Sequence, residues 1–280
     1  MKRLILHPTD LSPETFTAFA HALRISVNDR SGIYIIHADD TQNKHLNWNN
    51  YPAVRKTLHR WGEVEADLQK EKLNEKLGID IKKVATKANK IVDAIITFRN
   101  QRRYGIDLLI VGTQRRKGLP RWIKPSTSEQ IARKVNVPTL FVPNITNKFV
   151  NYENGTVLLE NILIAVDHSP PAQIGITAAA EFLRRFRHQK PVITLLHVGK
   201  EEQRPVADLH LFNNLKSDYL SKNGVPVEEI LNTADTIDAD LIVMTSHGHD
   251  GFLDVLRGSV TERVLRESRC PLLMIPANES

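Results

Sequence analysis

A short loop near the end of the chain combines residue types that bind phosphate. Gly248 is followed, after nine further residues, by Gly258 and Ser259, and a segment with helical periodicity begins at Val260. Gly248 permits close backbone approach, and Gly258 can adopt the positive φ of a turn before a helix. The backbone N–H groups of Ser259, Val260 and Thr261 would then face an anion, with the positive end of the helix dipole behind them. This spacing predicts a phosphate-binding loop.

The same loop also fits a structural alternative. Ser259 is a good helix N-cap, and Glu262, three residues later, could complete a capping box with it. We favour phosphate binding because the motif comes with a second glycine, Gly248, and because it lies within a repeated segment.

Other residues with suitable chemistry stand where apolar, strand-like segments end. Asp167 follows one such segment, His197 and Val198 end a second, and Thr245 and His247 end a third. In a doubly wound sheet, ligands bind beyond the carboxyl ends of the strands, where the strand order reverses. We therefore expect these residues and the phosphate-binding loop to converge on one cleft. A hydrogen-bonded, structural role remains the ordinary interpretation of His197 and of His37, which stands at the equivalent strand end in the first half.

The residues around this cleft do not form a recognised catalytic set. His247 and His249 are two imidazoles in one loop, without a cysteine or a further ligand at metal-binding spacing, so we predict no metal site. The sequence contains no P-loop lysine motif, no G-x-S-x-G and no H-E-x-x-H. We expect a binding protein with slow hydrolysis at most, rather than an efficient enzyme.

The chain contains an internal repeat. Residues 107–143 align without a gap on residues 240–276, at a constant offset of 133, and the start of the chain recurs near position 161. About 140 residues are sufficient for an independent hydrophobic core. We therefore predict two domains of one fold, at 1–147 and 158–280.

The first copy of the loop has lost its glycines. Arg115 stands at the position of Gly248, and Pro125 stands at the position of Gly258. Proline has no N–H group to donate, and arginine would extend a long side chain into the space of a phosphate. This cationic loop could instead bind another small anion, or face solvent or a protein partner. The candidates for an anion site in the first domain are Arg115, Arg116, Lys117 and Ser126.

Charge is divided unevenly between the halves. The net charge is +6 overall: residues 1–150 carry 26 Lys and Arg against 14 Asp and Glu, whereas residues 151–280 carry 12 against 18. A basic half could meet an anion or an acidic partner, but the interleaved aromatics and motifs of nucleic-acid binders are missing, so nucleic acid is not expected. The single cysteine, Cys270, fits a packed small side chain in a reducing compartment. No apolar run approaches the roughly 18–20 residues of a membrane span, and we expect a soluble, cytoplasmic protein.

Both halves alternate apolar, strand-like segments with amphipathic, helix-like ones. Near-continuous apolar strands separated by such helices predict a parallel sheet that is covered on both faces. Each half is therefore expected to be a small, doubly wound α/β domain. In the first half, residues 58–77 read as one long amphipathic helix.

Taken together, these features resemble the universal stress protein family, in a tandem form with two domains in one chain. Nucleotide-binding members have Gly-x-x-Gly, nine further residues, Gly-Ser/Thr, and an Asp that ends the first strand. Gly248, Gly258 and Ser259 match the loop, and Asp167 matches the acid. Thr245 stands where the first glycine of the motif is expected. Its Cβ and hydroxyl could crowd a nucleotide or could donate a hydrogen bond to it.

The resemblance implies two doubly wound, parallel five-stranded domains of the Rossmann-like, adenine nucleotide alpha hydrolase-like type, packed as a pseudo-twofold pair. It also implies a stress-response protein that binds ATP or a related adenine nucleotide in its second half, with Mg²⁺ as a counterion, as a regulatory or sensing module. Asp167 would then lie near the adenine–ribose end, and the backbone of Val198 would meet the adenine.

Two alternatives remain open at this point. The chain could be a scaffold or sensor that acts through protein contacts, or it could bind another small anion or metabolite. The second half also lacks about 27 residues between its second and fourth strands relative to the first half. One face of its sheet would be left poorly covered, and large apolar faces are seldom left exposed to water. We therefore expect a homodimer or a protein partner.

Overall fold

The chain folds into two compact units. In the computed structural model, unit 1 comprises residues 1–137 and 141–157, and unit 2 comprises residues 138–140 and 158–280. The structure describes residues 3–38, 48–88, 90–101, 105–113, 127–144, 149–247 and 260–277. None of the helices within these ranges is long and apolar enough to span a membrane.

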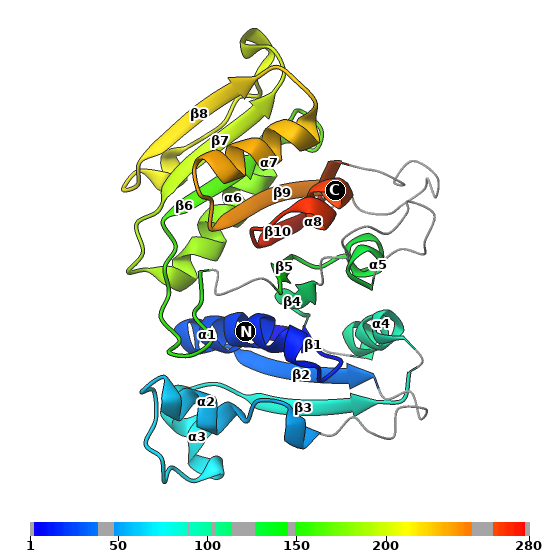
Figure 1. Ribbon diagram of the computed structural model, residues 1–280, viewed down its shortest axis with the longest axis vertical. Coiled ribbons are helices and arrows are strands. Elements are labelled where there is room, and N and C mark those ends of the chain that lie inside the picture. Colours follow the sequence, from blue (N-terminus) through cyan, green and yellow to red (C-terminus); the bar gives the residue numbers. More distant parts are fainter. Residues whose placement is uncertain are drawn as a thin grey trace. The chain divides into compact units, whose positions relative to one another are not determined.

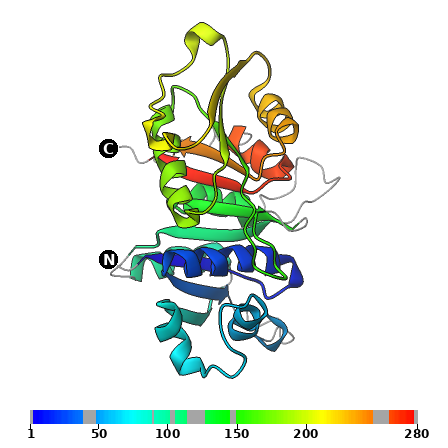
Figure 2. The same cartoon turned by 90° about the vertical axis from the view of Figure 1, so that its left-hand side faces the viewer.

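Unit 1 is built on described strands in the order β3-β2-β1-β4-β5, and the registered pairs among β1 to β4 are parallel (Figure 1). Every residue of β1 is buried, as expected for an apolar strand in the middle of a sheet that is covered on both faces. Right-handed crossovers place α1 on one face of the sheet and α4 and α5 on the other, and Figure 2 shows α1 in front of the strands. The strands are β1 (Leu4–Pro8), β2 (Gly32–Ala38), β3 (Ile81–Thr86), β4 (Leu108–Thr113) and β5 (Thr139–Pro143), and the helices are α1 (Phe16–Asp29), α2 (Val54–Arg60), α3 (Lys70–Leu77), α4 (Ile91–Gln101) and α5 (Thr127–Lys134).

Unit 2 has the corresponding strand order, β10-β9-β6-β7-β8, and its registered pairs are parallel as well. By the same crossover rule, α6 covers one face of the sheet while α7 and α8, which pack on each other, cover the other. The α/β fold class that the sequence predicts is confirmed. The strands are β6 (Asn161–Ala165), β7 (Val192–Val198), β8 (Ser217–Lys222), β9 (Leu241–His247) and β10 (Leu272–Ala277), and the helices are α6 (Ala172–Leu183), α7 (Pro226–Thr236) and α8 (Val260–Glu267).

Two aspartates at equivalent positions of the repeat perform the same structural task. In unit 1, Oδ2 of Asp107 accepts a hydrogen bond from the backbone N–H of Leu4, where β1 begins. In unit 2, Oδ2 of Asp240 accepts hydrogen bonds from Glu160 and Asn161, where β6 begins. These carboxylates therefore satisfy backbone donors at the amino end of each central strand, opposite to the end at which ligands are expected.

The prediction of one long helix over 58–77 is wrong. Two helices, α2 and α3, flank a turn, and Gly62 has a φ of +74° in that turn. The N–H of Gly62 bonds to the carbonyl of His59, which closes the end of α2. A left-handed glycine is a common helix terminator, and here it outweighs the amphipathic pattern that continues beyond it.

The middle of unit 2 contains a strand, β8, that its sequence pattern does not predict. The segment between β7 and β8, residues 199–216, carries only two short 3-10 turns, Glu201–Gln203 and His210–Phe212. We call this segment the β7–β8 strap. It replaces the two helices that unit 1 places between β2 and β3.

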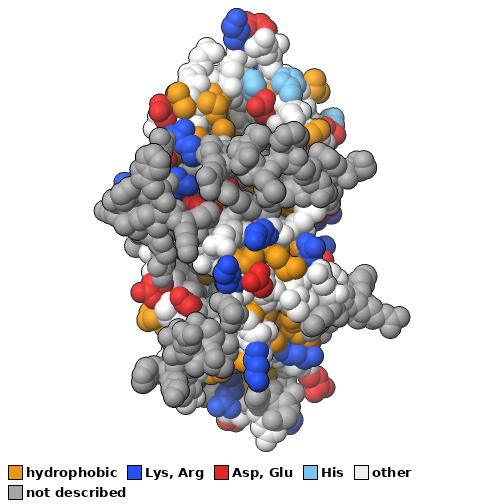
Figure 3. Space-filling model, turned by 90° about the vertical axis from the view of Figure 1, so that its right-hand side faces the viewer, with side chains coloured by type: hydrophobic (Ala, Val, Ile, Leu, Met, Phe, Trp, Pro, Cys, Tyr) orange, Lys and Arg blue, Asp and Glu red, His pale blue; other side chains and the backbone are white. Residues whose placement is uncertain are grey.

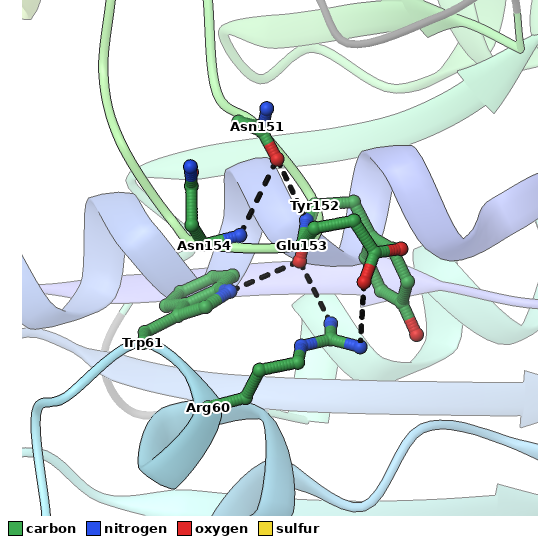
Figure 4. A network of polar contacts seen from close by, with 6 residues as sticks. All are labelled: Arg60, Trp61, Asn151, Tyr152, Glu153 and Asn154. Atoms are coloured by element: carbon green, nitrogen blue, oxygen red, sulfur yellow. Dashed lines mark hydrogen bonds and ion pairs between the residues drawn. The ribbon is translucent and has the colours of Figure 1, made fainter.

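The polar segment that joins the two halves of the sequence is packed against unit 1. The backbone carbonyl of Tyr152 accepts two hydrogen bonds, at 2.7 Å from Arg60 and at 3.0 Å from the indole N–H of Trp61 (Figure 4). The same Arg60 forms an ion pair with Glu153 at 3.2 Å and lies 4.4 Å from the centre of the Tyr152 ring. The segment is therefore held by the end of α2 through both its backbone and its side chains.

Close packing brings the backbone of this segment against α1 and α2. Gly155 has a φ of +69°, and a Cβ at this position would collide with the Trp61 ring and with the Arg24 guanidinium. Nearby, the ring of Phe149 packs edge-on against buried His21 at 4.5 Å. Residues 149–157 therefore complete the hydrophobic packing of unit 1.

Candidate functional site

The strand register in unit 2 brings three of the predicted site residues to one edge of the sheet. Ala165 of β6 pairs with Leu196 of β7 and with Met244 of β9. Beyond this row, Asp167 follows β6, Val198 ends β7, and Thr245 continues β9. Asp167 and Val198 lie two residues beyond this row and Thr245 lies one residue beyond it, so all three stand at the carboxyl edge that the three strands share.

Asp167 is exposed at this edge and holds the turn that follows β6. Its Oδ1 accepts a hydrogen bond from the backbone N–H of His168 at 2.8 Å. The imidazole of His168 in turn donates from Nε2 to the backbone carbonyl of Gln203 at 2.6 Å. A ligand at this strand end could therefore contact the second carboxylate oxygen of Asp167 and the outer side of this turn.

Further hydrogen bonds hold the β7–β8 strap beside Asp167. The side-chain amide of Gln173, in α6, exchanges hydrogen bonds with the backbone N–H and carbonyl of Asp208, at 3.0 and 3.4 Å. The hydroxyl of Tyr219 donates to the carbonyl of Pro205 at 2.8 Å. Burial raises the pKa of Tyr219, a nearby Arg204 opposes the shift and Asp167 adds to it, so the phenol remains a hydrogen-bond donor at neutral pH. The strap therefore lines one side of the carboxyl edge of the unit 2 sheet.

His197 lies behind the edge and is buried. Its Nδ1 is 3.4 Å from the carbonyl of Val166, and its ring is 6.1 Å from that of His168, nearly perpendicular to it. In unit 1, Nδ1 of His37 makes the corresponding contact with the carbonyl of Thr9 at 2.9 Å. The expected structural, hydrogen-bonded role of both histidines is confirmed. Figure 3 looks onto the side toward which the β9 arrow of Figure 1 points, and histidine side chains are visible on unit 2 there.

The structure shows where the side chain of Thr245 is accommodated. A Cβ built on Gly175 of α6 would lie only 2.8 Å from Oγ1 of Thr245, so the hydroxyl occupies the space that a side chain on the helix would fill. At the equivalent strand position of unit 1 stands Gly112, and there a Cβ would meet Ala18 of α1 at an ordinary 3.6 Å. In unit 1 the strand carries the glycine, Gly112, and the helix carries the larger Ala18. In unit 2 the helix carries the glycine, Gly175, and the strand carries the larger Thr245. Thr245 therefore packs against α6 rather than extending beyond the end of β9.

This exchange predicts a strong coupling between the two positions. Gly175→Ala alone should destabilise unit 2, because the new methyl group would force Thr245 from its rotamer. In a Thr245→Gly background, the same substitution should stabilise the protein by roughly 0.5–1 kcal/mol, the usual gain of replacing glycine by alanine within a helix. Chemical unfolding of the four proteins, followed by circular dichroism, should give a coupling energy of about 1–2 kcal/mol. Additive effects would show that Thr245 and Gly175 do not share this space.

The residues predicted to hold phosphate fall largely outside the described part of the chain. Gly248, Gly258 and Ser259 are outside the described residues. For His247, the structure gives only its position at the end of β9. Val260 and Thr261 open α8, with Val260 exposed and Thr261 buried. The backbone N–H groups of these two residues therefore belong to the first turn of a helix, as the phosphate-loop hypothesis requires.

The glutamate of the structural alternative is buried in both copies of the repeat. Glu262 of α8 and its counterpart Glu129 of α5 both lie in the first helical turn, and they expose 4% and 9% of their surface. A carboxylate at this position is stabilised by the helix dipole. The burial favours a structural role for Glu262 itself, and it leaves the exposed side of the turn, around Val260, for an anion.

The equivalent edge of unit 1 is filled by side chains of the chain itself. His7 of β1 is fully buried, with Nδ1 at 2.8 Å from the carbonyl of Ile110 and Nε2 at 2.7 Å from the hydroxyl of Tyr51. Burial lowers the pKa of His7 to about 4 and raises the pKa of Tyr51. The neutral imidazole therefore donates from Nδ1 to Ile110 and accepts at Nε2 from Tyr51. The Tyr51 ring also packs against Phe16 and Phe19 at 5.6 and 5.4 Å.

The aromatic cluster continues across the ends of β1 and β2. Trp48 packs edge-on against both Tyr51 and His37, each at 6.1 Å, and Lys83 lies over its ring at 5.0 Å. The β7–β8 strap of unit 2 contains neither tryptophan nor tyrosine. The strap of unit 2 therefore offers no indole or phenol ring that could fill its edge in this way. The cationic candidates of unit 1, Arg115, Arg116, Lys117 and Ser126, lie outside the described residues.

Several residues that shape these two edges were not predicted from the sequence. Gly175 carried a usable signal, since a glycine within an otherwise alanine-rich helix often marks close approach of a neighbour. His168, Gln173 and Tyr51 gave no such signal, because their partners are distant in the sequence. Among the described residues, no group of three or more His, Cys, Asp or Glu side chains is placed to hold a metal ion.

Comparison with known proteins adds independent information. The sequence model of the Universal stress protein family matches residues 1–143 and 212–276. Universal stress protein MJ0577 of Methanocaldococcus jannaschii is 40% identical over 57 residues, which span 20% of this chain and 35% of that protein. Universal stress protein YxiE of Bacillus subtilis is 24% identical over 150 residues, which span 42% of this chain and 99% of its own length.

The fold is also similar to that of a solved structure of comparable length. The crystal structure of a universal stress protein from Archaeoglobus fulgidus superposes with a TM-score of 0.64 at 17% identity, covering 98% of each chain. At this identity the similarity concerns the fold alone. The family match, however, includes parts of both units and most of the sequence. The chain belongs to the universal stress protein family.

Proposed function

We propose that unit 2 binds ATP or a related adenine nucleotide at the edge formed by β6, β7 and β9, and that the protein serves as a nucleotide-responsive module in a stress response. The observation that carries the proposal is the position of Asp167, Val198 and Thr245 at one carboxyl edge, with the Thr245 side chain turned onto Gly175. Ligands of doubly wound sheets bind at such edges. The extra bulk of Thr245 therefore need not crowd the nucleotide.

Each residue would have a distinct role. Asp167 would accept hydrogen bonds at the adenine–ribose end, and the backbone of Val198 would contact the base. Gly248, Gly258 and Ser259, together with the first N–H groups of α8 at Val260 and Thr261, would surround the phosphates. Mg²⁺ would accompany the phosphates as a counterion. His247 would border the phosphate end as the last residue of β9.

Unit 1 would act as a companion that does not bind nucleotide in this way. Tyr51 and Trp48 occupy the corresponding edge, and the hydrogen bond between Tyr51 and buried His7 would be lost if the ring were displaced. Removing that bond would leave a buried nitrogen unsatisfied, which costs about 1–3 kcal/mol. The second candidate function is therefore binding of a protein partner, through unit 1 and the exposed side of unit 2.

A pair of equivalent substitutions tests the proposed site. Asp167→Ala removes the strand-end carboxylate of unit 2, and Asp10→Ala removes its counterpart in unit 1, so each serves as the control for the other. Purified protein would first be denatured, and the filtrate examined for released nucleotide by its absorbance near 260 nm. Added ATP with Mg²⁺ should then raise the melting temperature of the stripped wild type and of Asp10→Ala, but raise that of Asp167→Ala much less. Equal shifts for the two variants would argue against the proposed site.

A further inference from the structure

The outer strand of unit 2, β8, has one free edge. It is the last strand in the order of its sheet, and it pairs in parallel with β7 from Ser217 to Lys222. Figure 1 shows β8 at the margin of unit 2. Its residues are exposed or half-buried throughout. An edge of this kind presents unpaired backbone N–H and C=O groups that can pair with another strand.

The hydrogen bonds to β7 identify which residues present these groups. The carbonyls of Lys216 and Lys222 accept bonds from Ile193 and Gly199 of the β7 side, both at 2.8 Å. Successive residues of a strand direct their backbone groups to opposite sides. Even-numbered residues of β8 therefore face β7. The backbone groups of Ser217, Tyr219 and Ser221 point away from it, where no strand lies within the described residues.

The side chains of β8 also divide between two faces. Nζ of Lys222 is 3.8 Å from the Glu229 carboxylate, which places the even-numbered side chains on the α7 face. Asp218 is exposed on this face, and Leu220 exposes 37% of its surface. An acidic, an apolar and a basic side chain thus follow one another along a single face of the free edge.

This order is self-complementary in one antiparallel register. When Leu220 lies opposite Leu220 of a second copy, Asp218 lies opposite Lys222 of that copy, and the reciprocal pair forms by symmetry. The outward backbone groups of Tyr219 and Ser221 then face each other as hydrogen-bonded pairs. The Leu–Leu and Asp–Lys pairs fall at non-hydrogen-bonded positions, where opposite side chains are closest.

The neighbouring register of β8 lacks this complementarity, and the edge strand of unit 1 is more basic. Shifting the centre to Tyr219 would place Lys216 opposite Lys222, and like charges at opposite positions are destabilising. In unit 1, the edge strand β3 carries Lys82 and Lys83, and lysines along an edge strand are a common protection of sheet edges against pairing. Charge therefore favours pairing at β8, in a single register.

We propose that two copies of the chain associate through antiparallel pairing of their β8 strands, centred on Leu220. The pairing joins two sheets edge to edge and covers the apolar Leu220 side chains. It is independent of the nucleotide proposal, because β8 lies at the far side of β7 from β6.

Complementary charge variants test this interface. Asp218→Lys places two lysines opposite each other in a homodimer, and Lys222→Glu does the same with two carboxylates. Each variant alone should self-associate roughly tenfold more weakly than the wild type. An equimolar mixture should recover wild-type association, because each mixed pair again joins opposite charges. Sedimentation velocity over a concentration series up to the high micromolar range measures the association of the wild type, the two variants and the mixture.

Two further variants complete the design. Ser221→Pro removes an outward N–H while leaving the bonds to β7 intact, and it should abolish the dimer. Asp235→Lys makes the same charge change at an exposed residue of α7 and should have no effect. Circular dichroism confirms that each variant is folded. A wild type that remains monomeric throughout the series, a mixture that stays as weak as its components, or a dimer that persists in Ser221→Pro would each overturn the proposal.

Discussion

Acidification from neutral pH to about pH 4 is expected to remove several kcal/mol from the free energy of unfolding of unit 1. Burial lowers the pKa of His7 and the pKa of His21 from 6.5 to about 4. A group with a lower pKa in the folded state takes up protons preferentially in the unfolded chain. The stabilisation that such a group gives the folded state is therefore complete above pH 6.5, declines as the pH falls and is lost below pH 4. Each histidine contributes up to about 3 kcal/mol.

His21 allows a direct test of this pH dependence. Its Nδ1 contacts the carbonyl of Thr17, but no described residue forms a hydrogen bond with its buried Nε2. His21→Leu should therefore have about the same free energy of unfolding as the wild type at neutral pH. On acidification to about pH 4.5, its free energy of unfolding should fall by about 2–3 kcal/mol less than that of the wild type. All three tryptophans lie in the first half of the sequence, so urea unfolding followed by tryptophan fluorescence reports on unit 1. An unchanged profile in His21→Leu would contradict the explanation.

Replacing Gly155 by alanine should destabilise unit 1 by roughly 2–5 kcal/mol, from a strained backbone together with steric overlap. The φ of +69° disfavours any side chain, and the new methyl group would collide with Trp61 and Arg24. The segment 149–157 should detach from α2, and the contacts of Tyr152 with Arg60 and Trp61 should be lost with it. We expect a lower urea midpoint and a red-shifted tryptophan emission.

Gly62 provides a matched control for this substitution. It has a similar φ of +74°, but a Cβ there would meet no atom of the described residues within 4 Å. Gly62→Ala therefore reports the backbone contribution alone, about 1 kcal/mol. The difference between the two variants measures the packing of the segment against Trp61. If Gly155→Ala costs no more than Gly62→Ala, the segment is not packed as described.

The sequence predicted the fold class well because its strands are continuous apolar runs. β1, β6, β7 and β9 needed no long-range information, since a strand buried on both faces is apolar at nearly every position. The strand β8 was missed because it is a polar edge strand with little apolar signal. The predicted helix over 58–77 was wrong because amphipathic periodicity does not register a single glycine that ends a helix.

The candidate site was predictable at its strand ends and not in its surroundings. Asp167 and Val198 follow from the rule that ligands bind at carboxyl edges. The packing of Thr245 against Gly175, and the filling of the unit 1 edge by Tyr51, depend on contacts between residues far apart in the sequence. No local pattern encodes such contacts. The two domain boundaries, the pseudo-twofold packing and the phosphate loop remain predictions.

Calorimetric titration of ATP with Mg²⁺ is the most direct test of nucleotide binding by unit 2. The wild type would be compared with a Gly258→Ala/Ser259→Ala variant and with Ser126→Ala, which alters the equivalent serine of unit 1. We predict binding near one site per chain for the wild type and for Ser126→Ala, and loss of the heat signal in the unit 2 variant. No heat from folded wild-type protein, or binding that survives in the unit 2 variant, would contradict a nucleotide site at this edge.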